Sequence, residues 1–253
     1  MKRISFFTYG IICYAIFLTT FLYAIGFVGN LLVPKSLDAI PTLPLVDAML
    51  INFGLLGVFA IQHSVMARPT FKRWWMRFVP QPVERSTYVL FSSLALAALF
   101  VFWQPMGGQI WEVENTIGQI VLYGLFAFGW GLVLVSTFLI NHFDLFGLQQ
   151  VWFFLRRKPI PSPQFVAPGP YKLVRHPLYL GFLLAFWATP AMTVTHLLFA
   201  VVTTVYILAA IRLEERNLTD DFGGRYRAYQ QQVPMIIPSV SRQTGIRHSD
   251  SVA

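Results

Sequence analysis

Long apolar blocks separated by short polar segments dominate the pattern of this chain. A helix needs roughly 20 residues to cross the ~30 Å hydrocarbon core of a bilayer, and five blocks are long enough to cross or enter it. They cover residues 6–30, 44–66, 86–104, 117–140 and 178–211. The pattern therefore predicts an all-α polytopic membrane protein, with four transmembrane helices followed by a C-terminal helical hairpin, five to six membrane segments in all.

The fifth block differs from the others because it is the longest and holds Pro190 near its middle. A proline inside a helix costs about 3 kcal/mol and commonly breaks it. We therefore expect two packed helices, a short one over 178–189 and a longer one over 193–211, joined at Thr189-Pro190-Ala191. The pattern leaves open whether this pair crosses the bilayer fully or re-enters on the same side.

Basic residues between these blocks set the orientation of the chain. With the N-terminus placed in the cytoplasm, 18 of the 19 Lys and Arg residues fall in cytoplasmic segments, and only Lys35 falls outside. This bias follows the positive-inside rule, and it requires the fifth block to cross outward and return. We expect an integral protein of a bacterial inner membrane with both termini in the cytoplasm.

Composition supports this class and narrows the partners. The chain is 56% apolar and 12% charged, whereas soluble domains carry about 25% charged residues. The formal net charge of +8 follows from the same rule, so the lipid bilayer rather than nucleic acid is the expected partner. The single cysteine, Cys13, excludes an internal disulfide. We expect no metal site, and the sequence predicts no oligomeric state.

The chain divides into three regions. Residues 1–140 hold the first four transmembrane helices, 141–238 hold a cytoplasmic loop, the hairpin and a C-terminal cofactor-binding region, and 239–253 form a polar tail that we expect to be disordered. In the loop, apolar residues recur at helical spacing from Leu145 to Leu155. They predict an amphipathic helix at the membrane surface.

Charged and polar residues cluster at both ends of the fifth apolar block. Before it, Arg175 supplies a fixed positive fork between two tyrosines, and after it Glu214 and Glu215 supply negative charge. A pocket with both signs of charge and aromatic faces suits a small ligand of mixed charge. The alternative is that Arg175 anchors the chain to the membrane, while the two glutamates form a solvated helix end paired with Arg212 and Arg216.

The same residues form a signature in two halves. It reads Gly-Pro-Tyr-x-x-x-Arg-His-Pro-x-Tyr-x-Gly over 169–181, Glu-Glu-x-x-Leu over 214–218, Phe-Gly-x-x-Tyr-x-x-Tyr over 222–229, and Val-Pro at 233–234. This signature is similar to that of the isoprenylcysteine carboxyl methyltransferase superfamily of integral membrane enzymes. The segment 141–152 resembles more narrowly the methanethiol S-methyltransferases within it.

The resemblance implies methyl transfer from S-adenosyl-L-methionine to methanethiol, a small volatile thiol, giving dimethyl sulfide and S-adenosylhomocysteine. It also implies which residues line the cofactor: Phe165, Val166, Tyr171, His176, Pro177, Leu178, Tyr179 and Glu214. On physical grounds we add that Arg175 can meet the cofactor carboxylate, and that Glu214 can meet its amino group or the ribose hydroxyls.

A thiol reacts as its thiolate, so some group must take the proton or favour the anion. His142 and Asp144 are the candidates nearest to the fourth helix end. We expect this helix to loosen near Asn141, with Gly147 allowing a further turn, so that His142 or Asp144 can act as base or orienter. The alternative is a polar group that merely caps the interface, and His63 is a second candidate base.

A small apolar pocket is expected beside these residues. We assign Phe143, Phe146 and Gln149 to its wall. Two other functions remain open from the sequence. One is the same chemistry on another acceptor, such as a prenylcysteine carboxylate or a lipid amine, and the other is a transporter or a non-catalytic membrane subunit that uses Arg175 and Glu214 as a gate.

Overall fold

The computed structural model describes residues 1–161 and 164–238. Five of its helices are long and apolar enough to cross a membrane, and a sixth, α8 (Pro177–Trp187), is shorter. The five are α1 (Lys2–Gly29), α2 (Leu45–Ala67), α4 (Gln81–Phe102), α5 (Thr116–Ile140) and α9 (Val194–Phe222). The predicted all-α polytopic membrane fold is confirmed, while the predicted disordered tail lies outside the described residues.

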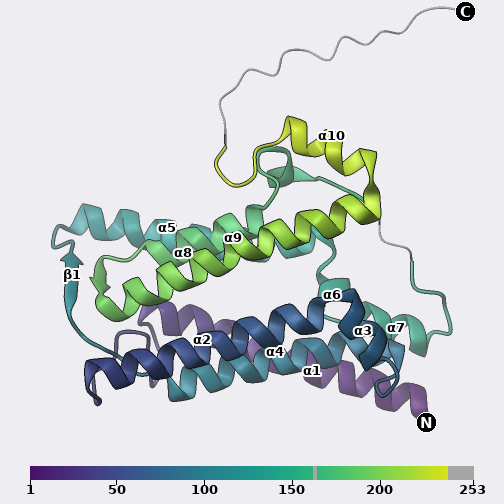
Figure 1. Cartoon of the computed structure of the whole chain (residues 1–253), viewed down its shortest axis with the longest axis horizontal. Coiled ribbons are helices and arrows are strands. Elements are labelled where there is room, and N and C mark those ends of the chain that lie inside the picture. The colour runs from purple at the N-terminus through teal and green to yellow at the C-terminus, as the bar shows by residue number, and fades with distance from the viewer. Residues whose placement is uncertain (162–163, 239–253) are drawn as a thin grey trace, which may run out of the picture.

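The long helices form two layers, with α5, α8 and α9 in one and α1, α2 and α4 in the other (Figure 1). Helices α5 and α8 approach closely at two facing glycines. A Cβ atom on Gly129 would lie 2.6 Å from the Gly181 oxygen, and one on Gly181 would lie 2.6 Å from the Gly129 oxygen. Between the layers, aromatic and aliphatic side chains such as Phe21 and Trp130 fill a continuous core.

The fifth apolar block is broken at Pro190, as predicted. After α8 the chain forms a short strand, β2 (Ala191–Thr193), before α9 begins. This strand pairs antiparallel with β1 (Gln109–Glu112), a sheet that the sequence did not predict. Helix α9 continues well beyond residue 211, because no glycine or proline interrupts it before Gly223, and so it carries Glu214 and Glu215 within its last turns.

At the β1 end of the molecule, Asp38 and His196 form a clasp across the two layers. The Asp38 carboxylate accepts hydrogen bonds from Asn30 Nδ2 at 2.7 Å and from the Thr193 hydroxyl, and it lies 3.0 Å from His196 Nδ1. The other ring nitrogen of His196 lies 3.0 Å from the Phe186 carbonyl oxygen. Both ring nitrogens of His196 thus face acceptor oxygens, so this side chain links the first loop to the end of α8.

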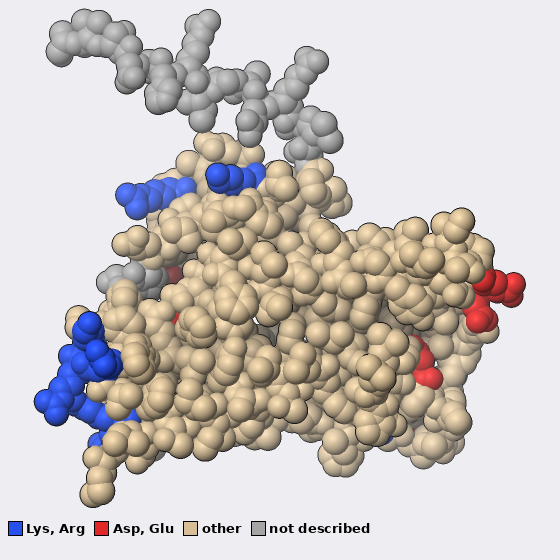
Figure 2. Space-filling view, turned by 180° about the vertical axis from the view of Figure 1, so that it is seen from behind, with Lys and Arg blue, Asp and Glu red and all other residues tan. Residues whose placement is uncertain are grey.

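The opposite end is basic, and Figure 2 shows Lys and Arg gathered there, with Asp and Glu at the β1 end. Helix α5 ends at Ile140, as expected, because Asn141 is extended and its side chain accepts from the Asp144 amide. The chain then forms α6 (His142–Leu145), turns at Gly147 with φ 85°, and continues as α7 (Leu148–Leu155). Short helices α3 (Pro69–Trp75), η1 (Gly169–Lys172) and α10 (Gly224–Gln232) complete this end.

Candidate active site

Glu215 joins the two halves of the polar signature. One of its carboxylate oxygens lies 2.7 Å from Arg175 Nε and 3.0 Å from His176 Nε2, and the other accepts from Gln230 Nε2 at 3.2 Å. Arg175 and Glu215 are 12% and 16% exposed, so this ion pair is largely shielded from water. The loop before α8 and the last turns of α9 therefore meet at one charged cluster.

A C-terminal segment of residues 233–236 closes this cluster. A terminal nitrogen of Arg175 donates to the carbonyl oxygens of Gln230 at 3.0 Å and Val233 at 2.6 Å. The backbone amides of Arg175 and His176 donate to Pro234 and Met235. The segment is therefore tied to the loop by both side-chain and main-chain bonds, a role that the sequence did not reveal.

Glu214 and Tyr179 form the neighbouring pair. The Tyr179 hydroxyl donates to the Glu214 carboxylate at 2.8 Å. The alternative reading of Glu214 and Glu215 as a helix end paired with Arg212 and Arg216 is wrong for Glu215, whose basic partners are Arg175 and His176. The cofactor roles expected for Arg175 and Glu214 stay predictions. Much of the Arg175 guanidinium is already engaged within the protein.

Tyr171 places the loop against α5. Its hydroxyl lies 3.5 Å from the Ser136 carbonyl oxygen, and its own carbonyl accepts from the Tyr229 hydroxyl at 2.5 Å. Burial raises the pKa of Tyr171 above its ordinary range and raises the pKa of Tyr229 to about 12. Both tyrosines therefore stay neutral and act as hydrogen-bonding groups at physiological pH.

The remaining predicted cofactor residues surround this cluster. The Phe165 ring packs against the rings of Phe222, Tyr226 and Tyr229. Pro177 is buried at the start of α8, Leu178 is partly buried, and Val166 is 50% exposed. Tyr226 is 1% exposed, yet its hydroxyl has no hydrogen-bond partner among residues 1–161 and 164–238. A buried unpaired hydroxyl beside aromatic rings fits a bound ligand with polar groups and a flat ring.

His142 is fixed by hydrogen bonds on both ring nitrogens. Its Nδ1 lies 2.8 Å from the Thr137 hydroxyl, which already donates to the Leu134 carbonyl, so Nδ1 carries the proton. Its Nε2 lies 2.8 Å from the Tyr14 hydroxyl, and it accepts a hydrogen bond from that hydroxyl. The ring stacks on Phe138, and burial lowers the pKa of His142.

Asp144, the other candidate base, points elsewhere, because its carboxylate accepts from Gln150 at 2.9 Å. Of the three residues predicted to wall the pocket, Phe146 packs inside, with its ring stacked on Phe17 at 3.8 Å. Phe143 is 52% exposed, and Gln149 accepts from Asn141 at 2.7 Å at the surface. The structure therefore brings His142 and Phe146 together, whereas Phe143, Asp144 and Gln149 lie outside this contact.

A second polar group within the helices was only partly foreseen. His63 of α2 lies 3.0 Å from the Tyr88 hydroxyl and 3.2 Å from the Ser92 hydroxyl, both on α4. The next residue, Ser64, lies 3.2 Å from the Tyr206 hydroxyl of α9. The signal in the sequence was the four-residue spacing of Tyr88 and Ser92 within an apolar helix, which places both on one face.

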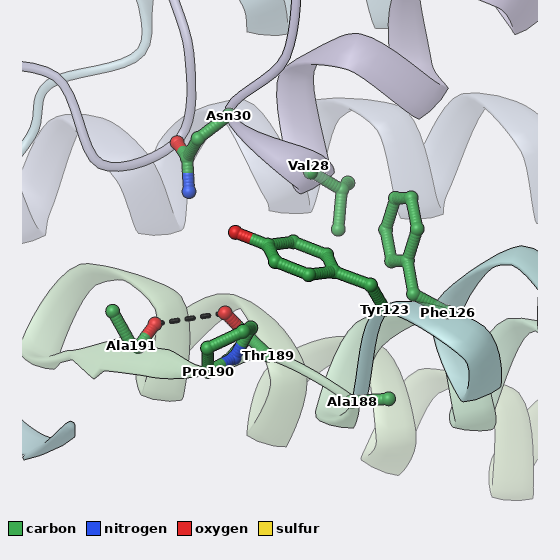
Figure 3. A pocket seen from close by; sticks show the side chains of 9 residues that line it. Val28, Asn30, Tyr123, Phe126, Ala188, Thr189, Pro190 and Ala191 are labelled. Carbon is green, nitrogen blue, oxygen red and sulfur yellow. Dashed lines mark hydrogen bonds between the residues drawn. The ribbon is translucent and has the colours of Figure 1, made fainter. Parts of the chain in front are cut away.

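Two hollows among the described residues bear on where ligands could bind. The first, of about 160 Å³, lies between α1 and the turn after α8, beside Asn30, Tyr123 and Thr189 (Figure 3). It is at the β1 end, away from the charged cluster. The second is an apolar groove of about 430 Å³ lined by Leu183, Leu208, Met235, Ile236 and Ile237. Because the Met235 carbonyl binds the His176 amide, this groove borders the cluster.

Fold and site together define a polytopic membrane protein with a polar cluster at one end of its helices, the arrangement of a membrane methyltransferase. Comparison with known families agrees, because residues 119–225 match the phospholipid methyltransferase family. That match contains the whole hairpin and the residues Arg175, His176 and Glu215 of the charged cluster, but not the C-terminal segment 233–236.

Relatives that span nearly the whole chain make the assignment narrower. The chain is 55% identical to the methanethiol S-methyltransferase of Crocosphaera subtropica, over 96% of both chains. It is 51% identical to that of Mycobacterium tuberculosis, over 96% of this chain and all of the relative, and 54% identical to methanethiol S-methyltransferase 1 of Bradyrhizobium diazoefficiens, over 92% and 81%. The chain belongs to the methanethiol S-methyltransferase family. No solved structure matches it.

Proposed function

We propose that this protein transfers a methyl group from S-adenosyl-L-methionine to methanethiol, forming dimethyl sulfide and S-adenosylhomocysteine. The observation that carries the proposal is the cluster built by Arg175, His176 and Glu215, in which the two ends of the hairpin meet. This cluster lies where the polar loop, α9 and the C-terminal segment converge, which is the arrangement that a ligand of mixed charge requires.

The donor supplies an electrophilic methyl group on a sulfonium, together with an ammonium, a carboxylate and an adenine. Glu214 would hold the ammonium or the ribose hydroxyls, with Tyr179 keeping its carboxylate in place. Phe165 and Tyr226 would pack on the adenine, and the unpaired Tyr226 hydroxyl would find a partner there. Arg175 would orient the loop through Glu215 and present its remaining N–H groups to the carboxylate.

The acceptor is small and apolar, and the chain offers an apolar approach to it. The groove beside Leu183 and Leu208 gives a volatile thiol a route from the bilayer to the cluster. Phe17 and Phe146 would form the wall of the thiol pocket. His142 would hold that wall in place, because Tyr14 and Thr137 fix its ring through both nitrogens. Holding two reactants in line can contribute about 7–11 kcal/mol.

The same proposal places the protein in a bacterial inner membrane, with the basic end in the cytoplasm. That end carries the charged cluster, where a water-soluble cofactor would enter. Labelling of single-cysteine variants in intact cells tests the orientation. A cysteine introduced at Ser5 should stay protected from a membrane-impermeant reagent, and one at Glu114, beyond β1, should react.

Purified protein incubated with S-adenosyl-L-methionine carrying a labelled methyl group tests the reaction. The acceptors are methanethiol, ethanethiol, a prenylcysteine and phosphatidylethanolamine, with products followed by gas chromatography or extraction. We expect dimethyl sulfide as the main product and slower turnover of ethanethiol, since one methylene changes discrimination by about 1–3 kcal/mol. Faster methylation of the prenylcysteine or the lipid, or no methylation at all, would overturn the proposal.

A further inference from the structure

Two hydrogen-bonded relays of the same design occur in this protein. In one, the Tyr14 hydroxyl bonds to His142, which bonds to Thr137. In the other, the Tyr88 hydroxyl bonds to His63, which bonds to Ser92. Each relay has a tyrosine, a histidine and a small hydroxyl residue. The Thr137 hydroxyl donates to a carbonyl three residues earlier, and that of Ser92 to a carbonyl four residues earlier.

The chain of bonds fixes the proton positions in the second relay. The Ser92 hydroxyl donates to the Tyr88 carbonyl at 3.0 Å, so its oxygen accepts from His63 Nδ1. The Tyr88 hydroxyl lies 3.0 Å from both ring nitrogens of His63, and with the Nδ1 proton directed to Ser92 it donates to Nε2. In this arrangement the phenolic oxygen keeps lone pairs free, and any proton it receives can be passed on to the histidine.

The second relay lies at the contact between the two helix layers. Ser64 and Tyr206 bridge α2 and α9 directly beside it, and about two turns further on α9 carries Glu214. Tyr179 in turn holds Glu214. Tyr88 also belongs to a buried cluster against which Phe17 and Phe146, the proposed wall of the thiol pocket, are packed. The relay therefore stands between the cofactor residues and the aromatic wall.

The charged groups around the relay disfavour a long-lived positive charge on His63 and leave brief proton transfer possible. The Arg85 guanidinium lies 5.2 Å from the centre of the Tyr88 ring and also faces His63. Glu84 from α4 and the neutral hydroxyl of Tyr206 from α9 face Tyr88 as well. The positive charge of Arg85 favours an anion at the pocket and opposes a long-lived imidazolium at His63.

We propose that Tyr88 is the catalytic residue that accepts the thiol proton, and that His63 positions it and receives the proton in turn. This inference rests on the proposed function. As the thiol sulfur forms its new bond to the methyl carbon, the donor S–CH₃ bond breaks and its electron pair stays on the donor sulfur. The S–H proton passes to the Tyr88 oxygen, and the Tyr88 proton passes to His63 Nε2. The thiol leaves as a neutral thioether, and the positive charge moves from the donor to His63.

Tyr88→Phe tests the proposal, with Tyr14→Phe as the matched control, because each removes one hydroxyl from one of the two relays. General acid–base catalysis contributes about 10²–10⁴-fold, so kcat/KM for methanethiol in Tyr88→Phe should fall by about 100-fold at about pH 7. The loss should shrink to below about 10-fold near pH 9.5, where free thiolate is available without a base. Tyr14→Phe should lose less than about 5-fold at every pH.

Calorimetric binding of S-adenosylhomocysteine checks that both variants keep the cofactor site, and equal affinity is expected. In His63→Gln the loss of kcat/KM should likewise shrink as the pH rises, since His63 acts through Tyr88. A loss in Tyr88→Phe that stays constant with pH would overturn the proposal, as would an equal loss in Tyr14→Phe. If the wild-type protein turned over no methanethiol, the proposed function itself would be refuted and this inference with it.

Discussion

Replacing Glu215 by Gln removes the charge on which the cluster depends while keeping the shape of the side chain. The Arg175 guanidinium would lose its 2.7 Å ionic partner, and His176 would lose its 3.0 Å acceptor. Breaking a fully buried ion pair by removing one partner costs about 3–5 kcal/mol. Because these side chains are 12% and 16% exposed and the amide oxygen can still accept a hydrogen bond, we expect roughly 2 kcal/mol here.

The cost should fall on the C-terminal segment, because Arg175 holds Val233 and Gln230 through the same guanidinium. About 2 kcal/mol corresponds to a roughly 30-fold rise in the population of the open segment. Hydrogen exchange of a peptide covering 233–236 should accelerate by that factor in detergent. Affinity for S-adenosylhomocysteine, measured by calorimetry, should fall by much less than this factor, because apparent affinity follows the closed fraction, and the closed form remains the major state.

Glu214→Gln is the matched control, one residue away. It weakens only the bond from Tyr179, so we expect a stability loss of roughly 1 kcal/mol and unchanged exchange at 233–236. Its cofactor affinity should still fall, because Glu214 is proposed to contact the ligand directly. Equal exchange rates in the two variants, or wild-type exchange in Glu215→Gln, would refute the view that Glu215 holds the segment closed.

Three further predictions concern the fold. Gly147→Ala should lower the free energy of unfolding by roughly 3 kcal/mol, from left-handed strain plus overpacking. The φ of Gly147 is 85°, and a Cβ there would lie 2.6 Å from the Ser86 nitrogen. Thermal unfolding in detergent measures the loss, and Gly124→Ala, where a Cβ would meet no atom within 4 Å, is the control. Gly129→Ala should separate α5 from α8 and lower the melting temperature, whereas Gly131→Ala, which faces open space, should not. Burial raises the pKa of Tyr229 to about 12, so its contribution to stability is complete below the unfolded pKa of about 10 and is lost between about pH 10 and 12. A free energy of unfolding whose pH dependence over this range was the same in the wild type and in Tyr229→Phe would contradict the assignment.

The membrane topology follows from the sequence because a bilayer rewards long apolar runs directly. The break at Pro190, the end of α5 before Asn141 and the turn at Gly147 were predicted for the same kind of reason, since each rests on a local backbone preference. Local rules of this kind do not depend on which helices become neighbours. That is why they survive in the folded structure.

The choice between Glu214 and Glu215 depends on the rotation of α9, which the sequence does not set. Adjacent residues on a helix point about 100° apart, so packing between α8 and α9 decides which carboxylate faces Arg175. The C-terminal segment and the β1–β2 pair depend on contacts between distant parts of the chain. The His63 relay was missed as a unit for the same reason, because two separate helices supply it.

The clasp between Asp38 and His196 joins residues that are 158 positions apart. Burial alone would raise the pKa of the Asp38 carboxyl, but the hydrogen bonds from His196 and Thr193 lower it below its ordinary value. The charged form of Asp38 is therefore stabilised only when these two residues are in place. During synthesis the first loop emerges long before the final hairpin, and until then Asp38 lacks its partners Thr193 and His196. A chain that inserts its hairpin wrongly lacks this link between its first loop and α9, and so loses the stability that these buried hydrogen bonds contribute to the finished molecule.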